Sequence, residues 1–152
     1  MECLALNLEE AKTRNDKHSA FAFLRAASQK GWEISLAVPL LIEEVLNNMG
    51  HYALQTLEQA ARSGIDVLDF DAPNGMQAWE ILRLMLEMTP LASVRRDILQ
   101  ILTELARHRA SHLDYFADEI EQCANDTRMS GDFLKVAAAC LAAFQDAGVE
   151  PD

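Results

Sequence analysis

Apolar residues recur at three- and four-residue spacing along almost the whole chain, and this spacing is what most constrains the fold. Residues so spaced fall on one face of an α-helix, whereas a half-buried strand alternates every two residues. Glycine and proline are also scarce, with six and four in 152 residues. An all-β fold needs frequent turns, which consume both residue types. The sequence therefore predicts an all-α protein.

The periodicity predicts about seven helices in a single α-helical domain, residues 1–152, a length that can build a sizeable core. Short polar side chains are favoured at helix N-caps, which predicts Asn74 as the cap of the fourth helix and Ser111 as the cap of the sixth. The segment between the third and fourth helices is expected to be a loop. The expected helices occupy residues 7–29, 38–50, 52–62, 76–88, 92–108, 111–124 and 130–148.

Short connections between these helices predict consecutive antiparallel hairpins. Two of the joints, at Thr89-Pro90 and Thr127-Arg128, lie about 38 residues apart, within the range of helical-hairpin repeats such as HEAT and armadillo units. A helical bundle with up-and-down hairpins fits the same pattern. Both architectures, a bundle and a short HEAT- or armadillo-like array, stay open at this stage.

Charge and cysteine usage narrow the class of partner and the compartment. The formal net charge is −11 at pH 7, which disfavours binding to phosphate backbones and to anionic membranes. No apolar run approaches the roughly 18 residues that span a bilayer, and the N-terminus lacks a secretory pattern. The cysteines, Cys3, Cys123 and Cys140, are odd in number and widely spaced, as is typical of reduced thiols. We expect a cytoplasmic protein with no membrane partner, and nucleic acid is an improbable ligand.

One short segment carries a possible catalytic motif. Arg107 and His112 are separated by four residues, and the polar His108 follows the arginine. This arrangement resembles the RxxxxH motif of the HEPN superfamily of all-α, metal-independent ribonucleases. The resemblance implies His112 as the acid/base group or phosphate contact and Arg107 as the transition-state clamp, in a dimer cleft. In that family the motif opens the last long helix, whereas here it falls between two expected helices, where basic residues also complement a helix C-terminus.

Other catalytic patterns are absent from the sequence. It has no glycine-rich phosphate loop, no HExxH and no GxSxG, and we expect neither a cofactor nor a metal. The leading prediction is therefore a non-catalytic protein–protein interaction module with an acidic surface, such as an adaptor, an inhibitor or immunity-type protein, or a small subunit. Its partner is expected to be a protein, and a homodimer is possible. The HEPN-like ribonuclease is the alternative.

Six residues are candidates for partner binding. Trp32 and Trp79 lie in or next to connections, where an exposed tryptophan can anchor an interface. Arg95 and Arg96 stand near the start of a helix, where positive charge opposes the helix dipole and suggests a partner or an intramolecular carboxylate. Glu87, Asp118 and Glu119 are the candidate carboxylates, and the remaining candidate binding residues are Arg107 and Arg109.

A stripe of large apolar residues follows Trp79 at helical spacing. Methionine-rich faces can form adaptable binding surfaces, but such a stripe is more often part of a core. We expect core as the main role of its further members, Leu82, Met85, Leu86 and Met88.

Overall fold

A computed structural model describes residues 37–48, 51–89 and 91–149 of the chain. Within these ranges the protein is all-α, as predicted, and its only β pairing is an isolated bridge between Asp71 and Gln77. The expected helix at 7–29 and the candidate Trp32 lie outside the described residues. None of the helices in the described ranges is both long and apolar enough to cross a membrane. The elements are α3 (Val38–Asn48), α4 (His51–Arg62), α5 (Ala78–Met88), α6 (Ala92–Arg107), the 3-10 helix η2 (Leu113–Phe116), α7 (Ala117–Ala124) and α8 (Gly131–Asp146).

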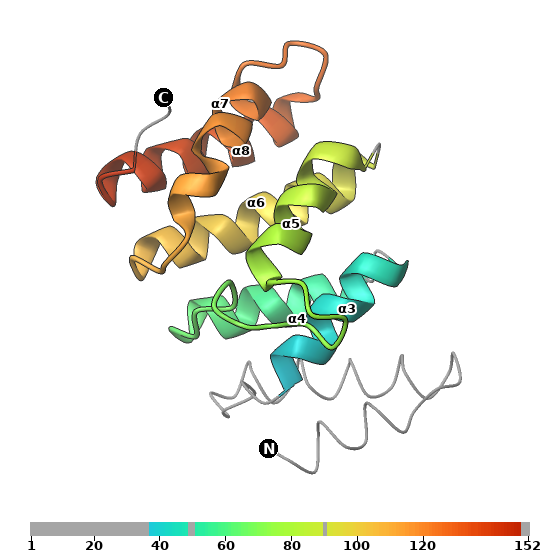
Figure 1. The fold of residues 1–152 in the computed structure, drawn as a ribbon. Helices are drawn as coiled ribbons and strands as arrows, with labels where there is room; N and C mark the ends of the chain where they lie inside the picture. The colour runs from blue at the N-terminus through green and yellow to red at the C-terminus, as the bar shows by residue number, and fades with distance from the viewer. Residues whose placement is uncertain (1–36, 49–50, 90, 150–152) are drawn as a thin grey trace.

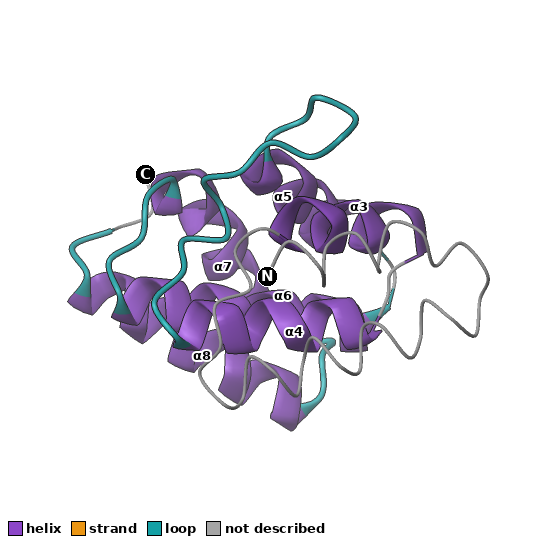
Figure 2. Ribbon diagram, turned by 90° about the horizontal axis from the view of Figure 1, so that it is seen from below, coloured by secondary structure: helices purple, strands orange, loops and turns teal. Residues whose placement is uncertain are grey.

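The helices stack as three hairpins in chain order (Figure 1). The second helices of the hairpins form one layer, in which α6 packs between α4 and α8. The first helices lie on the other side, where α3 packs against α5, and the two layers are visible from below in Figure 2. The helices α5 and α7 pack against each other less closely than α6 and α8 do. A repeat in the sequence beneath this stacking stays a prediction.

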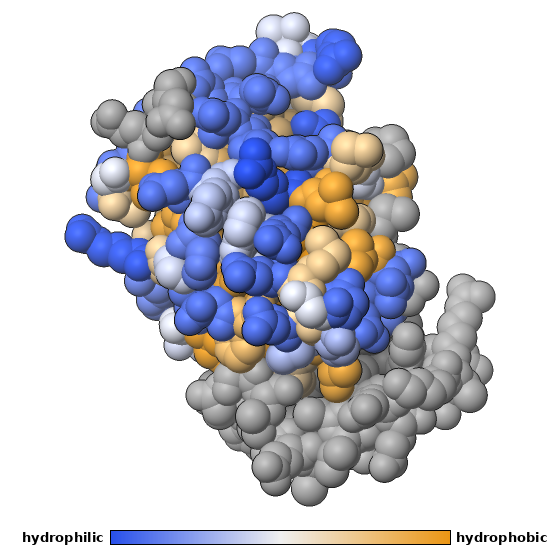
Figure 3. Space-filling model, viewed as in Figure 1, coloured by the Kyte–Doolittle hydropathy of each residue, from blue (hydrophilic) through white to orange (hydrophobic). Residues whose placement is uncertain are grey.

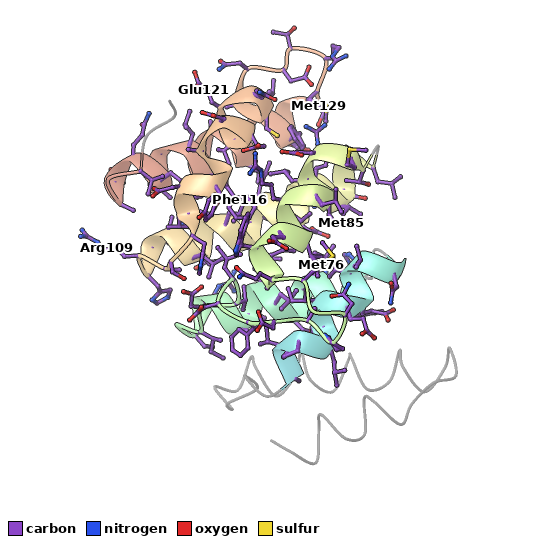
Figure 4. All side chains as sticks on the ribbon, viewed as in Figure 1. Met76, Met85, Arg109, Phe116, Glu121 and Met129 are labelled. Carbon is purple, nitrogen blue, oxygen red and sulfur yellow. The ribbon has the colours of Figure 1, made fainter. Side chains whose placement is uncertain are left out.

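The apolar faces predicted by the periodicity form one core. On α6, Ile98, Leu102 and Leu105 are buried, and on α8 Phe144 is fully buried. Phe116 lies at the centre of the molecule and is also fully buried (Figure 4). Burying one such side chain stabilises the fold by about 1.5–3 kcal/mol. Most of the stripe on α5 belongs to this core, as expected, since Leu82, Met85 and Leu86 are buried while Met88 is exposed.

The predicted start of the sixth helix at Ser111 is wrong. Here the chain turns through Arg109 and His112, both in the left-handed region with φ of 53° and 63°. The 3-10 helix η2 follows, and α7 begins only at Ala117. Ser111 caps no helix, because its backbone N–H and its hydroxyl both donate to Asp66 Oδ2. The predicted cap therefore ties this turn to the loop after α4.

Asn74 is likewise not the cap of α5. Its Oδ1 accepts the Met76 N–H at 3.0 Å within the preceding turn, and the N-cap is Gln77. The Gln77 N–H donates to Glu80 Oε2 at 3.4 Å, so Glu80 provides the backward half of a capping box. At the last helix, Ser130 does cap α8, since its Oγ accepts the Phe133 N–H at 3.3 Å.

Candidate functional site

Side-chain contacts join α5 to the η2–α7 segment on the first-helix side. Trp79 meets Tyr115, and one helical turn further along both segments Arg83 meets Glu119. The members of each pair are 36 residues apart, so the two segments run side by side in the same direction. We call this line of contacts the α5–α7 seam; its side chains are Trp79, Arg83, Leu86 and Glu87 on α5 and Tyr115, Glu119, Gln122 and Cys123 on η2 and α7.

An aromatic stack forms the first end of the seam. The Trp79 and Tyr115 rings are 4.1 Å apart between centroids and 11° from parallel. The His112 ring lies 6.2 Å from both and is also close to parallel. Trp79 is half-buried and its indole N–H donates to Gln77 Oε1, whereas Tyr115 is exposed. A half-exposed Trp–Tyr pair offers a broad apolar surface with a polar edge.

Beside this stack lies a cluster of one serine, one histidine and one aspartate. Its hydrogen bonds do not run in the direction that a catalytic serine needs. Ser111 donates its single hydroxyl proton to Asp66, and its Oγ lies 2.7 Å from His112 Nδ1. The imidazole must then donate Nδ1–H to the serine oxygen, because the hydroxyl has no second proton. A nucleophilic serine requires the opposite, a histidine that accepts the hydroxyl proton. This cluster therefore fixes the turn and orients His112.

Ion pairs form the middle of the seam. Arg83 contacts Glu119 at 3.0 Å and Glu87 at 3.2 Å, bridging α7 and its own helix. Arg83 is 40% exposed and Glu119 only 13%, so the pair is partly shielded from solvent. The Arg83–Glu119 ion pair therefore joins α5 to α7, whose backbones pack only loosely against each other.

A polar cavity of about 570 Å³ occupies the far end of the seam. We call it the seam cavity. Its walls come from α5 and from α7 with the turn that follows it, and α6 contributes Arg95. The lining residues are Leu86, Glu87, Thr89, Arg95, Glu119, Gln122, Cys123, Asn125, Asp126 and Arg128.

Arg95 has neither of the two seam carboxylates as a partner. Of the three expected carboxylate partners, Glu87, Asp118 and Glu119, the first and the last both pair with Arg83. The Arg95 guanidinium instead lies 3.3 Å from Cys123 Sγ and 4.0 Å from Met129 Sδ, and it sits over the Phe133 ring. Met129 belongs to the turn between α7 and α8 and is labelled in Figure 4.

The other predicted binding residues lie away from the seam. Arg96 is exposed; burial raises the pKa of the neighbouring Asp97, and the charge of Arg96 opposes this rise less than His51 does. Arg107 pairs with Glu104 at 2.8 Å and, together with Arg109, lines a separate cavity of about 380 Å³ against α8. Arg109 projects outward from the turn after α6 (Figure 4). Of the five candidates in the described ranges, Trp79 therefore lies on the seam and Arg95 lines the seam cavity, whereas the other three lie elsewhere.

The two residues of the RxxxxH motif line different cavities. Arg107 faces α8, whereas His112 borders a cavity of about 190 Å³ with Asp69, Phe70 and Gln77. The left-handed turn at Arg109 and His112 lies between them. Within the described part of one chain the two side chains thus border different cavities, and the ribonuclease resemblance stays a prediction.

Neither a reactive thiol nor a metal site is present within the described ranges. Burial raises the pKa of Cys140 to about 12, and it also raises the pKa of Cys123 although Arg95 acts in the opposite direction. Both thiols are therefore held in the unreactive protonated form. His108 Nε2 is 3.0 Å from the Arg62 carbonyl, and no three His, Cys, Asp or Glu side chains of the described ranges gather as metal ligands.

Sequence reasoning missed Tyr115 as a site residue, although a pattern for it existed. Tyr115, Glu119 and Cys123 are spaced four residues apart, as are Trp79, Arg83 and Glu87. Each set marks one face of a helix, but only the packing of α5 beside α7 shows that the two faces meet.

Comparison with protein-family models, curated proteins and solved structures gave no significant match to this chain. The chemistry of the seam is therefore the basis for a functional proposal.

Proposed function

We propose that this protein is a non-catalytic protein-binding module and that its partner docks along α5 and the α5–α7 seam. The observation that carries the proposal is the distribution of exposed apolar side chains. Leu84, Met88, Leu91 and Tyr115 are the large hydrophobic residues exposed in the described ranges, at 40%, 70%, 47% and 46%. All four lie on α5, just after it, or on η2 beside it. Such grouping on one element is typical of an interaction surface.

The position of these side chains gives the surface its shape. Leu84 and Met88 are neighbours on one flank of α5, since they are four residues apart. Glu87 faces the seam, and the next residue, Met88, projects about 100° further around the helix. Figure 3 shows apolar side chains gathered over α5 between hydrophilic ones. A partner that contacts both flanks of α5 would cover the apolar flank and the seam together.

The seam supplies the residue types that contribute most to protein interfaces. Tryptophan, tyrosine and arginine are enriched among residues whose truncation costs more than about 2 kcal/mol of binding energy. Trp79, Tyr115 and Arg83 stand next to one another on this surface. The stack and the ion pair also hold these side chains in place before binding, which reduces the entropy lost on association.

Net charge favours a different protein over a second copy as the partner. Each chain carries a formal charge of −11, so two copies repel each other. Repulsion of this kind weakens a homodimer most at low salt. The proposed partner is therefore another protein with an apolar patch that fits α5.

The test compares the wild-type chain with Tyr115→Ala and with Gln145→Ala, which shortens an exposed side chain on α8. Proteins retained from the source organism by the wild-type chain are identified, and the best candidate is purified for calorimetry. We expect Tyr115→Ala to weaken binding of this purified partner by roughly tenfold or more. Gln145→Ala should bind like the wild type.

Equal affinity of all three chains for every purified candidate would remove the seam as the binding site. A wild-type chain that associates only with itself in sedimentation experiments would replace the proposed partner by a second copy. Circular dichroism of each variant shows whether a loss of binding reflects a loss of fold.

A further inference from the structure

The seam cavity holds a guanidinium, that of Arg95, which forms no ion pair with a carboxylate of the described chain. All three carboxylates that line the cavity are already paired with other arginines. Glu87 and Glu119 contact Arg83 at 3.2 and 3.0 Å, and Asp126 contacts Arg128 at 3.0 Å. In the described ranges, no carboxylate forms an ion pair with Arg95.

The hydrogen-bond donors of Arg95 are also poorly satisfied. A guanidinium has five N–H donors, and thiol and thioether sulfurs are weak acceptors. Within the described ranges, the acceptors for the Arg95 guanidinium are Cys123 Sγ and Met129 Sδ, and its Nε is buried with no partner there. An unpaired donor on a buried charged group is unfavourable, and an acceptor that arrives from outside would remove that penalty.

The charge of Arg95 contributes little to the environment of Asp126. The pKa of Asp126 is lowered first by its hydrogen bonds with Arg128, and the charge of Arg95 contributes least among the causes. Asp126 is therefore held by Arg128 rather than by Arg95.

We propose that Arg95 binds a carboxylate of the partner protein, an aspartate or glutamate side chain that enters the seam cavity. This inference rests on the proposed function, because it assigns one contact within the same docking surface. A carboxylate matches the planar fork of a guanidinium and can accept two of its N–H groups. The carboxylates at the cavity wall disfavour a phosphate dianion, which carries twice the charge.

The position of the cavity supports this source of the ligand. The cavity opens at the end of the seam, next to the α5 residues Leu86 and Glu87, so a protein lying along α5 reaches it directly. A volume of about 570 Å³ accommodates one acidic side chain together with water. The buried carboxylate then neutralises a charge that would otherwise lose its hydration when the partner covers the seam.

The experiment uses the full ¹⁵N-labelled chain and propionate, which has the chemistry of a glutamate side chain. The NMR signal of the Arg95 Nε–H and the backbone amides of Cys123 and Asp126 are followed during titration. We expect a saturable shift with sodium propionate and none with sodium chloride at the same ionic strength. The shift should be absent in Arg95→Met and retained in Arg96→Met, which removes the same charge one residue away.

Two results would overturn the inference. A propionate response that equals the chloride response in the wild-type chain shows that Arg95 takes no carboxylate, and it needs no variant to fold. Tighter saturation with inorganic phosphate than with propionate shows that the site selects a different anion. Loss of partner binding in Tyr115→Ala together with an absent propionate response would reject the carboxylate contact and leave the proposed function intact.

Discussion

At the scale of single residues, Asp66 connects the loop after α4 with the turn after α6. The helical periodicity of the sequence does not predict this connection. Its Oδ1 accepts the Leu68 N–H at 3.2 Å, and its Oδ2 accepts both the backbone N–H, at 3.0 Å, and the hydroxyl of Ser111. Ser111 in turn contacts His112, whose ring borders the Trp79–Tyr115 stack. One carboxylate therefore supports the turn that presents the aromatic end of the seam.

Replacing this carboxylate should destabilise the protein. We expect Asp66→Ala to lower the free energy of unfolding by about 1–3 kcal/mol, because the N–H groups of Leu68 and Ser111 lose a charged acceptor. Asp69→Ala, in the same loop but exposed, should change it by less than about 0.5 kcal/mol. Urea unfolding followed by circular dichroism measures both. Equal losses of unfolding free energy in the two variants would show that the hydrogen bonds of Asp66 have no special part in stability.

The candidate site shows which of its residues the sequence alone singles out. Trp79 and Arg95 were identifiable because a tryptophan near a connection and an arginine near a helix start are unusual in themselves. The partners of Arg95 were not, because the seam carboxylates are taken by Arg83 and the sulfurs come from positions 28 and 34 residues away. Which arginine pairs with a given carboxylate depends on tertiary packing, and sequence spacing alone does not reveal that packing.

At the scale of elements, the described helices follow the periodicity closely, and the errors occur at their starts. Ser111 and Asn74 are good caps in isolation, but each finds an acceptor or donor in a loop instead. Short polar side chains form such local bonds as readily as caps, so the cap position remains ambiguous until the loop is known. Ser130 differs because its hydroxyl accepts the Phe133 N–H at the start of α8.

Ser130 therefore offers a direct test of capping. We expect Ser130→Ala to lower the free energy of unfolding by about 1 kcal/mol, since the Phe133 N–H loses its acceptor. Thr127→Ala, at an exposed position in the turn before α8, is the matched control. Chemical denaturation of the two variants gives the difference. A cost for Thr127→Ala that matches the cost for Ser130→Ala would assign the effect to the turn rather than to the cap.

At the scale of the whole molecule, the all-α class, the stacked hairpins and the core faces agree with the periodicity. Which helices of different hairpins pack against each other, such as α4 against α6, is seen only in the structure.

The packing of α4 against α6 buries acidic groups. Burial raises the pKa of Glu58; Arg62 opposes the shift, and Glu104 and Asp97 reinforce it. Burial also raises the pKa of Asp97, although His51, 3.4 Å away, opposes this. These carboxyls bind protons more tightly in the folded state than in the unfolded chain.

Stability should therefore increase as these carboxyls become protonated. For Glu58, the contribution is present below the ordinary pKa of 4.5 and is lost as the pH rises through the higher folded value. We expect Glu58→Gln to be more stable than the wild type at pH 7, with the difference shrinking as the pH falls towards 4.5. Thermal unfolding between pH 4.5 and 7.5 measures this difference.

Glu121→Gln removes the same charge from an exposed position on α7 and is the control for net charge. The stability changes of the two variants should differ in their pH dependence, because Glu58 is enclosed by the α4–α6 packing and Glu121 is exposed. Identical pH profiles for the two variants would attribute the effect to the overall charge of −11.

The stacking of hairpins in chain order also has a mechanical consequence. In the described part of the chain, α8 packs against α6 and α7, and α3 packs against α4 and α5, so each terminal hairpin is held by its neighbour alone. Detaching α8 from α6 leaves the contact between α6 and α4 intact. A force applied between residues 37 and 149 would therefore extend this part of the chain in steps, with an outer hairpin released first.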